Sequence, residues 1–293
     1  MCADQDSWTI GRLLNWTAEY LSEHGSPSAR LDAEVLLASV RRCERIELYT
    51  AFDHVADDGI RTAYRQLVRR RAEGTPVAYL VGHKEFYAMA FEVTPAVLIP
   101  RAETEFLVVA LLDLAKLHPN KASLRIADIG TGSGVLAITA AVHLPGCNVT
   151  ATDTSSEALE VAKRNAKTHA VSDRIGWFAG DLFADVESAD LFDFVLSNPP
   201  YVSEIEYEQL PLHIREHEPR RALFAGHRGT EVIERIVAES TARTATGGWL
   251  LLEISPMIEE AVRQIFDSHR EWQLKNITKD HAGHARLVQA RRI

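Results

Sequence analysis

The chain has 293 residues, a length that allows one large domain or two. With 46% hydrophobic and 25% charged residues, the composition is that of a globular protein and excludes a disordered, collagenous or coiled-coil chain. The formal net charge of -9 argues against broad, phosphate-driven binding to nucleic acid.

The sequence has no signal for a membrane or for secretion. It contains no run of about 18 apolar residues, and its N-terminus lacks the basic-then-apolar order of a signal peptide. Cys2, Cys43 and Cys147 lie far apart and form no CxxC pair, so we expect neither a zinc site nor a disulfide framework. These features favour a cytoplasmic protein without a metal.

Residues 1–75 are predicted to form a small helical domain. The apolar residues that share one face of its first helix are Ile10, Leu13, Leu14 and Ala18. A Gly-Ser-Pro break at 25–27 ends that helix. Further helices are expected over 31–40 and 58–73. The basic runs at 41–45 and 69–71 are interpreted as solvated helix faces, with a docking patch for an acidic or nucleic-acid-bearing partner as the alternative.

Residues 76–100 differ in character from the helical segments. They are rich in Val, Tyr and Phe and have almost no helical periodicity, so they are predicted to form a β-hairpin that links two domains. Pro100 ends this segment, and a helix is expected from about Glu103. We expect Arg101 to pair with one of the acidic residues that follow it.

Residues 101–293 alternate between apolar strands and amphipathic helices. This alternation predicts an α/β fold with a parallel sheet and helices on both faces, in which ligands bind outside the carboxyl ends of the strands. A capping box of Thr154 and Glu157 is expected at one helix start. The predicted strands are 124–129, 147–153, 174–181, 192–197 and 249–254, and the predicted helices are 135–144, 155–170, 232–245 and 258–269.

A glycine-rich segment lies between the first of these strands and its helix. It consists of Gly130, Thr131, Gly132, Ser133 and Gly134, and Val135 stands where the GxGxxG fingerprint of a dinucleotide site requires its third glycine. Glycines here allow a tight turn and a close approach of a ligand to the backbone. The GxGxG spacing resembles motif I of the S-adenosylmethionine-dependent methyltransferases.

Acidic residues end the next two strands. Asp153 lies 23 positions after Gly130 and can accept hydrogen bonds from both hydroxyl groups of an adenosine ribose. In methyltransferases, a carboxylate at the position of Asp181 commonly binds the adenine amino group. Leu182 and Phe183 are expected to pack on the adenine ring.

The segment Asn198-Pro199-Pro200-Tyr201 follows the strand at 192–197. Two prolines fix the backbone and remove two N–H donors, which leaves carbonyl oxygens free to accept hydrogen bonds. With the Asn198 amide, these oxygens can hold a planar NH2 group and direct its nitrogen toward a methyl group, while Tyr201 packs against the flat substrate. The segment resembles the motif of methyltransferases that act on exocyclic or amide nitrogens.

Further segments extend this resemblance over almost the whole chain. Together with residues 198–201 they resemble the HemK/PrmC family, the protein-(glutamine-N5) methyltransferases. These segments are 27–34 (PSARLDAE), 74–82 (GTPVAYLVG), 85–87 (EFY), 98–105 (LIPRAETE) and 218–223 (EPRRAL).

The resemblance implies a Rossmann-like catalytic domain that methylates the glutamine of the GGQ motif in class I peptide chain release factors. It implies that the helical domain holds the release factor, that residues 130–134, Asp153 and Asn198 contact S-adenosylmethionine, and that residues 198–201 hold the glutamine. The chain departs from the family at Leu182, where members often have Trp, and at Ser255 and Ile258, where they tend to have Gly and Gln.

The alternative function is an N-methyltransferase that acts on adenine or another exocyclic amine in DNA or RNA, for which the Asn-Pro-Pro-Tyr motif is equally suitable. That function predicts a basic face and a target-recognition domain, and the acidic balance of the chain speaks against it. An NAD-dependent oxidoreductase is disfavoured by Val135. We therefore expect a protein partner and no stable complex with nucleic acid or membrane.

Overall fold

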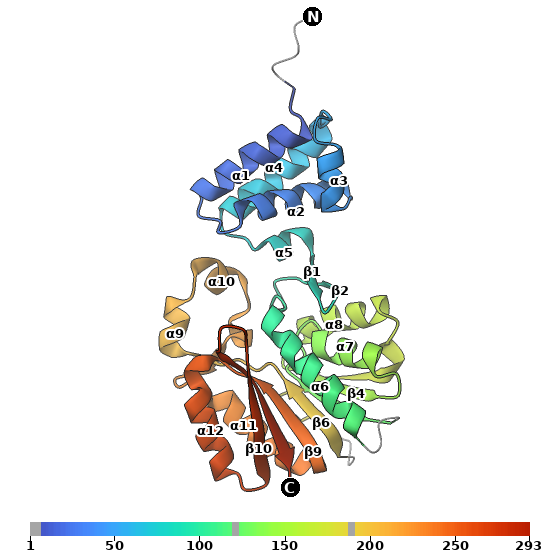
Figure 1. The fold of residues 1–293 in the computed structure, drawn as a ribbon, viewed down its shortest axis with the longest axis vertical. Coiled ribbons are helices and arrows are strands. Elements are labelled where there is room, and N and C mark those ends of the chain that lie inside the picture. The colour runs from blue at the N-terminus through green and yellow to red at the C-terminus, as the bar shows by residue number, and fades with distance from the viewer. Residues whose placement is uncertain (1–6, 119–122, 187–190) are drawn as a thin grey trace, which may run out of the picture. The chain divides into compact units, whose positions relative to one another are not determined.

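The computed structural model describes residues 7–118, 123–186 and 191–293. The chain divides into two compact units, Met1–His83 with Leu212–His217, and Lys84–Pro211 with Glu218–Ile293 (Figure 1). Within the described ranges, no helix has the length and apolar character needed to cross a membrane. Cys43 and Cys147 are free thiols, and Cys2 lies outside the described residues.

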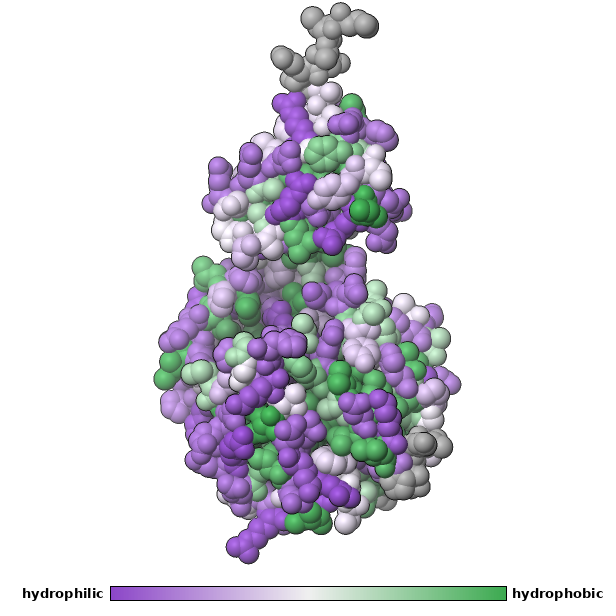
Figure 2. All heavy atoms as spheres, in the orientation of Figure 1, coloured by the Kyte–Doolittle hydropathy of each residue, from purple (hydrophilic) through white to green (hydrophobic). Residues whose placement is uncertain are grey.

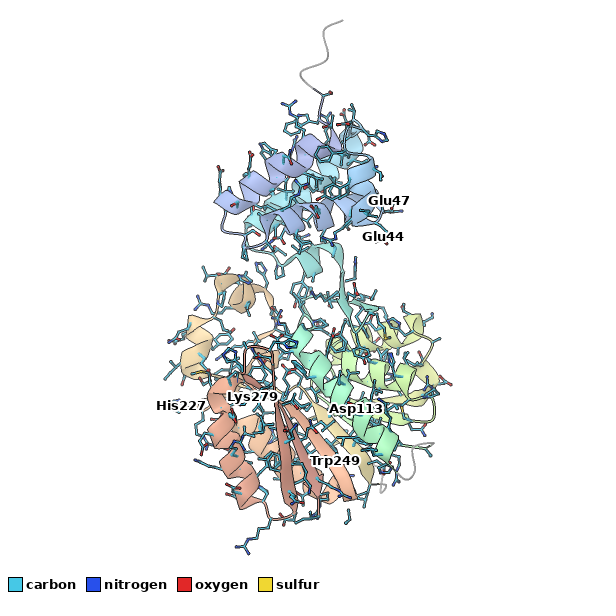
Figure 3. The ribbon with its side chains drawn as sticks, viewed as in Figure 1. Glu44, Glu47, Asp113, His227, Trp249 and Lys279 are labelled. Carbon is cyan, nitrogen blue, oxygen red and sulfur yellow. The ribbon has the colours of Figure 1, made fainter. Side chains whose placement is uncertain are left out.

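The first unit is a bundle of short helices. Its hydrophobic core includes Leu14, Leu36, Leu37, Leu48 and Tyr64, each with at most 2% of its surface exposed. The helices are α1 (Ile10–Glu23), α2 (Ala29–Arg41), α3 (Arg45–Thr50), α4 (Asp58–Ala72), α5 (Val77–Val81) and α10 (Leu212–His217). Helix α3 begins with a capping box in which Glu44 and Glu47 each accept the other's backbone N–H, and both side chains lie at its N-terminus (Figure 3).

The basic run at 69–71 was expected to be a solvated helix face, but one of its arginines is paired in the interior. Arg71 forms an ion pair with Asp32 at 2.7 Å, and both side chains are almost buried. Asp32 also accepts hydrogen bonds from the hydroxyl groups of Ser26 and Ser28. The residues of segment 27–34 therefore have structural partners inside the unit. Arg69, in contrast, pairs with Glu73 on the surface.

The segment predicted as a hairpin over 76–100 begins as helix α5, so this part of the prediction was wrong. The hairpin itself is shorter and consists of β1 (His83–Phe86) and β2 (Met89–Glu92). Tyr87 and Ala88 at its tip have φ values of 50° and 58°. Positive φ at both central residues is the geometry of the two-residue turns that match the twist of the flanking strands.

The second unit is built on a seven-stranded sheet of order β10-β11-β9-β6-β3-β4-β5. The predicted parallel sheet is in fact mixed, because β11 runs antiparallel to both β9 and β10. Neither β10 nor β11 was predicted from the sequence. The strands are β3 (Arg125–Ile129), β4 (Asn148–Asp153), β5 (Ile175–Ala179), β6 (Phe192–Ser197), β9 (Thr244–Glu253), β10 (Trp272–Lys279) and β11 (Ala285–Arg292).

Two hydrophobic clusters cover the two faces of this sheet. Alternate residues of one strand go to opposite clusters, as with Ile126 and Ala127 of β3. Helices α6 (Glu105–Leu117) and α7 (Val135–His143) pack in one cluster, and α8 (Ser156–Thr168) lies beside α7. Helices α11 (Glu231–Arg243) and α12 (Glu259–Ser268) pack in the other cluster. Ser155 caps α8, one residue after the Thr154 that we predicted.

Short elements complete this unit. Strands β7 (Val202–Ser203) and β8 (Phe224–Gly226) pair with each other in parallel. The remaining pieces are α9 (Glu204–Gln209) and the 3-10 turns η1 (Ala102–Thr104), η2 (Ser172–Arg174), η3 (Arg220–Ala222) and η4 (Pro256–Ile258). The face shown in Figure 2 is mostly hydrophilic, with hydrophobic residues scattered singly or in small groups, which is normal for a protein surface.

Candidate active site

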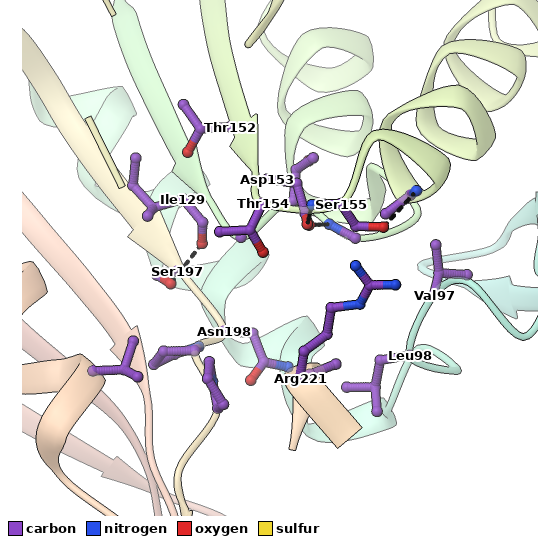
Figure 4. A pocket seen from close by; sticks show the side chains of 18 of the residues that line it. Val97, Leu98, Ile129, Thr152, Asp153, Thr154, Ser155, Ser197, Asn198 and Arg221 are labelled. Carbon is purple, nitrogen blue, oxygen red and sulfur yellow. Dashed lines mark hydrogen bonds between the residues drawn. The ribbon is translucent and has the colours of Figure 1, made fainter. Parts of the chain in front are cut away.

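A cavity of about 320 Å³ lies at the carboxyl ends of the parallel strands in the second unit (Figure 4). This volume is within the range of small-molecule sites. The segments that follow β3, β4, β5 and β6 all contribute to its wall, as the rule for ligands of parallel sheets predicts. The predicted site residues that line it are Gly130, Thr131, Gly132, Ser133, Asp153, Asp181, Leu182, Asn198, Pro199 and Pro200.

The glycine loop is tied to the neighbouring strand. The backbone N–H groups of Gly130 and Thr131 both donate to the carbonyl of Thr152, at 2.9 Å each. Gly130 has a φ of 73°, in the left-handed region that favours glycine, and no atom of the described residues lies within 4 Å of the place where its Cβ would stand. The loop therefore turns tightly and leaves open space beside its backbone.

Gly134 has a different role from the first two glycines of the loop. It is not among the residues that line the cavity, and a Cβ on it would lie 2.8 Å from Ile138 and 3.1 Å from Ala162. Its φ of 85° is also in the left-handed region. This glycine allows helices α7 and α8 to pack closely, so a direct contact with a ligand is not what requires it.

The carboxylate of Asp153 is held by two backbone groups. Its Oδ2 accepts from the N–H of Gly132 at 2.9 Å, and its Oδ1 accepts from the N–H of Ser155 at 2.8 Å. Burial raises the pKa of Asp153, and these two hydrogen bonds act in the opposite direction. Each oxygen retains a lone pair for a hydroxyl donor from a ligand in the cavity.

Asp128 holds the same loop from inside the protein. Its carboxylate accepts from the Thr131 hydroxyl at 2.6 Å and from the Ala137 N–H at 3.0 Å. Burial raises its pKa to about 6. This residue is fully buried and lies behind the cavity wall, so we assign it a structural role in shaping the loop.

The residues after β5 divide between the cavity and the core. Asp181 pairs with Arg235 of α11 at 2.8 Å, and both of these residues line the cavity. Leu182 also lines it and has a φ of 52°. Phe183 lies instead in the hydrophobic cluster beside Phe192, so the expectation that it packs on a ligand in this cavity is not met.

The Asn-Pro-Pro-Tyr segment is anchored at both of its ends. Before it, the Ser197 hydroxyl donates to the carbonyl of Ile129 at 2.6 Å. The Asn198 Nδ2 donates to the Thr104 hydroxyl at 3.0 Å. After it, the Tyr201 hydroxyl donates to Glu253 at 3.2 Å, and Tyr201 packs against the hydrophobic cluster rather than lining the cavity.

Glu253 is a buried carboxyl group that contacts the motif. It ends strand β9 and accepts hydrogen bonds from Tyr201 and from Thr104. Burial raises its pKa to about 7. Neither Glu253 nor Thr104 was predicted from the sequence to be a site residue. The available signals were an acidic residue at the end of an otherwise apolar strand and the place of Thr104 in segment 98–105.

Segments 98–105 and 218–223 are joined at the edge of the cavity. Glu218 is buried, and it pairs with Arg101 and accepts from the N–H of Ile99 at 3.2 Å. The expectation that Arg101 pairs with a following acidic residue was therefore wrong. The join places Pro100 and Arg221 in the cavity wall, where the Arg221 side chain points toward Asp153 (Figure 4).

Comparison with solved structures identifies the fold. The chain has a TM-score of 0.56 to the hMettl16 catalytic domain in complex with an RNA hairpin, at 16% identity, covering 77% of this chain and 80% of that one. It has a TM-score of 0.50 to a ribosomal protein L11 methylase from Lactobacillus delbrueckii, at 21% identity, covering 68% and 83%. This is the fold of the Rossmann-like methyltransferases, which the sequence analysis predicted.

Sequence comparison identifies the family of the chain. The model of the PrmC N-terminal domain matches residues 12–82, and that of the methyltransferase small domain matches 105–214. The release factor glutamine methyltransferase of Rhodopirellula baltica is 46% identical over 96% of this chain and 95% of its own. That of Geobacter sulfurreducens is 38% identical over 91% of each. The chain belongs to the release factor glutamine methyltransferase family, as the resemblance indicated.

Proposed function

We propose that this chain transfers a methyl group from S-adenosylmethionine to the side-chain amide nitrogen, N5, of the glutamine in the GGQ motif of class I release factors. The observation that carries this proposal is the Asn198 amide in the cavity wall. Its NH2 group donates a hydrogen bond to Thr104. Within the described part of the chain, its Oδ1 has no hydrogen-bond partner. The Oδ1 is thus available to accept from a substrate NH2 group.

The residues present in the cavity suit S-adenosylmethionine. The Asp153 carboxylate can accept from the ribose hydroxyl groups, and the open space beside Gly130 allows close approach of the ligand to the backbone. Asp181 and Leu182 would lie on the adenine side. When bound, this cofactor supplies an electrophilic methyl group on a sulfonium.

The protein's contribution to the reaction is to orient and activate the amide. The lone pair of an amide nitrogen is delocalised, so the nitrogen is a poor nucleophile. Acceptance of its two N–H groups by Asn198 Oδ1 and a proline carbonyl returns electron density to the nitrogen and favours the more tetrahedral transition state. The two prolines hold these acceptors in place, which supplies the alignment with the methyl group.

We infer that the partner is held by the helical unit. A single glutamine side chain offers little binding energy, so the rest of the substrate protein must supply it. We also infer that nucleic acid is not a substrate and that the protein acts in the cytoplasm. Although the fold is shared with an RNA-binding relative, a fold alone does not define a substrate.

The experiment is incubation of the full-length protein with labelled S-adenosylmethionine and a purified release factor, followed by mass mapping of peptides. The label is expected on the GGQ glutamine and is expected to disappear when that glutamine is replaced by alanine. DNA and RNA oligonucleotides, tested in parallel, should accept no label. Transfer to nucleic acid at a rate that matches the protein substrate would contradict the proposal and favour the alternative function.

A further inference from the structure

A buried chain of hydrogen bonds extends from the core of the second unit to the cavity. The Asn198 Nδ2 donates to Thr104 Oγ1 at 3.0 Å, and Thr104 Oγ1 donates to Glu253 Oε2 at 2.6 Å. Thr104 and Glu253 are each only 2% exposed. Thr104 comes from turn η1 and Glu253 from the end of β9, so neither belongs to the Asn-Pro-Pro-Tyr segment.

The direction of these hydrogen bonds follows from the number of protons available. Above a pH of about 7 Glu253 is ionised, and its carboxylate can then only accept, so it takes the single hydroxyl proton of Thr104. The Thr104 oxygen then faces Asn198 with a lone pair. An amide oxygen turned toward that lone pair would find no proton, whereas the amide NH2 group finds an acceptor.

A second contact fixes the same carboxylate. The Tyr201 hydroxyl donates to the other oxygen of Glu253, Oε1, at 3.2 Å. Both oxygens are thereby occupied by hydroxyl donors, one from each side. This arrangement holds the carboxylate in one position inside a region where an unpaired polar group would be costly.

We propose that Glu253, acting through Thr104, is a positioning residue that orients the Asn198 amide so that its Oδ1 faces the substrate. This inference rests on the proposed function and explains its selectivity. An Oδ1 acceptor suits the NH2 group of glutamine, which offers two donors, and does not suit the carboxylate of glutamate, which offers none. The reverse orientation of Asn198 would present donors and lose this preference.

The first test removes only the Thr104 hydroxyl. Thr104→Val keeps the shape of the side chain, and we expect it to lower the kcat for release-factor methylation by about 10- to 100-fold while the Kd for S-adenosylmethionine changes less than about threefold. Thr104→Ser keeps the hydroxyl and should recover most of the lost turnover. Turnover by Thr104→Val at the wild-type rate, or a Thr104→Ser variant as impaired as Thr104→Val, would overturn the inference.

A double-mutant cycle tests whether Thr104 acts through Asn198. If it does, adding Thr104→Val to Asn198→Ala should reduce kcat by less than about threefold further, because the amide that Thr104 orients is already gone. Full additivity of the two losses would show that Thr104 acts elsewhere. Thr104→Ala also lacks the hydroxyl and takes the place of Thr104→Val in both tests if the valine variant does not fold.

A third measurement needs no substrate and therefore separates this inference from the proposed function. In full-length protein with 15N-labelled asparagine, we expect the Asn198 side-chain NH2 to exchange its bonded proton slowly in wild type and in Thr104→Ser, and at least tenfold faster in Thr104→Val. Unchanged exchange in Thr104→Val overturns the orientation mechanism whether or not release factors are methylated. Failure of wild type to methylate a release factor, with the expected exchange pattern, overturns the proposed function alone.

Discussion

The backbone N–H of Gly132 and the Oδ2 of Asp153 are joined by a hydrogen bond of 2.9 Å, which connects the glycine loop to the end of β4. The same carboxylate accepts from Ser155 through its other oxygen. Asp153 thus shapes the loop and also presents its remaining lone pairs to the cavity. We expect this single side chain to couple the geometry of the loop to the recognition of the ligand.

The first prediction concerns binding of the cofactor. Asp153→Ala should weaken the binding of S-adenosylmethionine by roughly 1.5–3 kcal/mol, because two hydrogen bonds from the ribose to a charged acceptor are lost. Isothermal titration should show one site in wild type and the weaker affinity in the variant. A folded variant with unchanged affinity would remove Asp153 from the binding site.

The second prediction concerns turnover. Asn198→Ala should leave cofactor affinity largely intact but reduce kcat by about 100-fold or more, the scale of losing one preorganised polar contact. Steady-state methylation of a release factor, with cofactor titration as the control, measures both quantities. A variant with nearly the wild-type kcat would rule out the proposed hydrogen bonding of Asn198 to the glutamine amide.

The third prediction concerns the substrate protein. Deletion of residues 1–75 should spare cofactor binding, because every residue that lines the cavity belongs to the second unit. Methylation of an intact release factor should collapse, mainly through a higher KM, because the binding energy of the parent protein is lost. Equal KM values for the two proteins would show that the helical unit does not hold the substrate.

The fourth prediction compares two arginines of helix α4. Arg71→Ala should lower the free energy of unfolding by about 3–5 kcal/mol, because it leaves the Asp32 carboxylate buried without its cation. Arg69→Ala is the matched control: its pair with Glu73 is exposed, and its loss should cost less than about 1 kcal/mol. Urea denaturation measures both, and similar costs would contradict the assignment of Arg71 to the core.

The fifth prediction concerns pH. Burial, and to a lesser degree the nearby Glu103, raise the pKa of Glu253 from near 4.5 to about 7, while Thr104, Tyr201 and Arg286 act to lower it. The folded state therefore holds this proton more tightly than the unfolded chain. The resulting stability is fully present below pH 4.5 and is lost as the pH rises through about 7.

Replacement of the Glu253 carboxyl group tests the direction of this pH dependence. The free energy of unfolding of Glu253→Gln, measured relative to wild type, should increase by up to about 3 kcal/mol between pH 5 and pH 8. Asp128 also has a raised pKa but is present in both proteins, so the difference between them isolates Glu253. A difference that stays constant across this pH range would show that the pKa of Glu253 is not raised.

Local sequence patterns sufficed for the parts of the protein whose structure depends on neighbours in the chain. The apolar strand at 192–197 was predicted with the bounds that β6 has, because a run of buried residues between turn signals is itself the signal of such a strand. Gly130 follows strand β3 and Asp153 ends strand β4, and parallel strands present their carboxyl ends at one edge of the sheet. Their meeting at one cavity was therefore predictable.

The antiparallel strands β10 and β11 were not predictable in the same way. Strand β10 has mostly exposed or half-buried side chains, with Trp272 its one buried residue, so it lacks a strong apolar pattern. It is held at the edge of the sheet by its pairing with β11, and that pairing brings together residues such as Ile277 and Val288. Backbone pairing of this kind leaves little trace in local composition.

Only the tertiary structure decided which polar residues act together. Thr104 and Glu253 are 149 positions apart, and Asp32 and Arg71 are 39 apart, yet the first pair shares a buried hydrogen bond and the second a part-buried one. Read locally, Arg71 belonged to a solvated basic run and Glu253 to the end of an apolar strand. The sequence determined the parallel strands, the glycine turn and the motif residues, because backbone propensity and side-chain periodicity are local. The partners of buried charges are set by packing, which alone brings distant segments into contact.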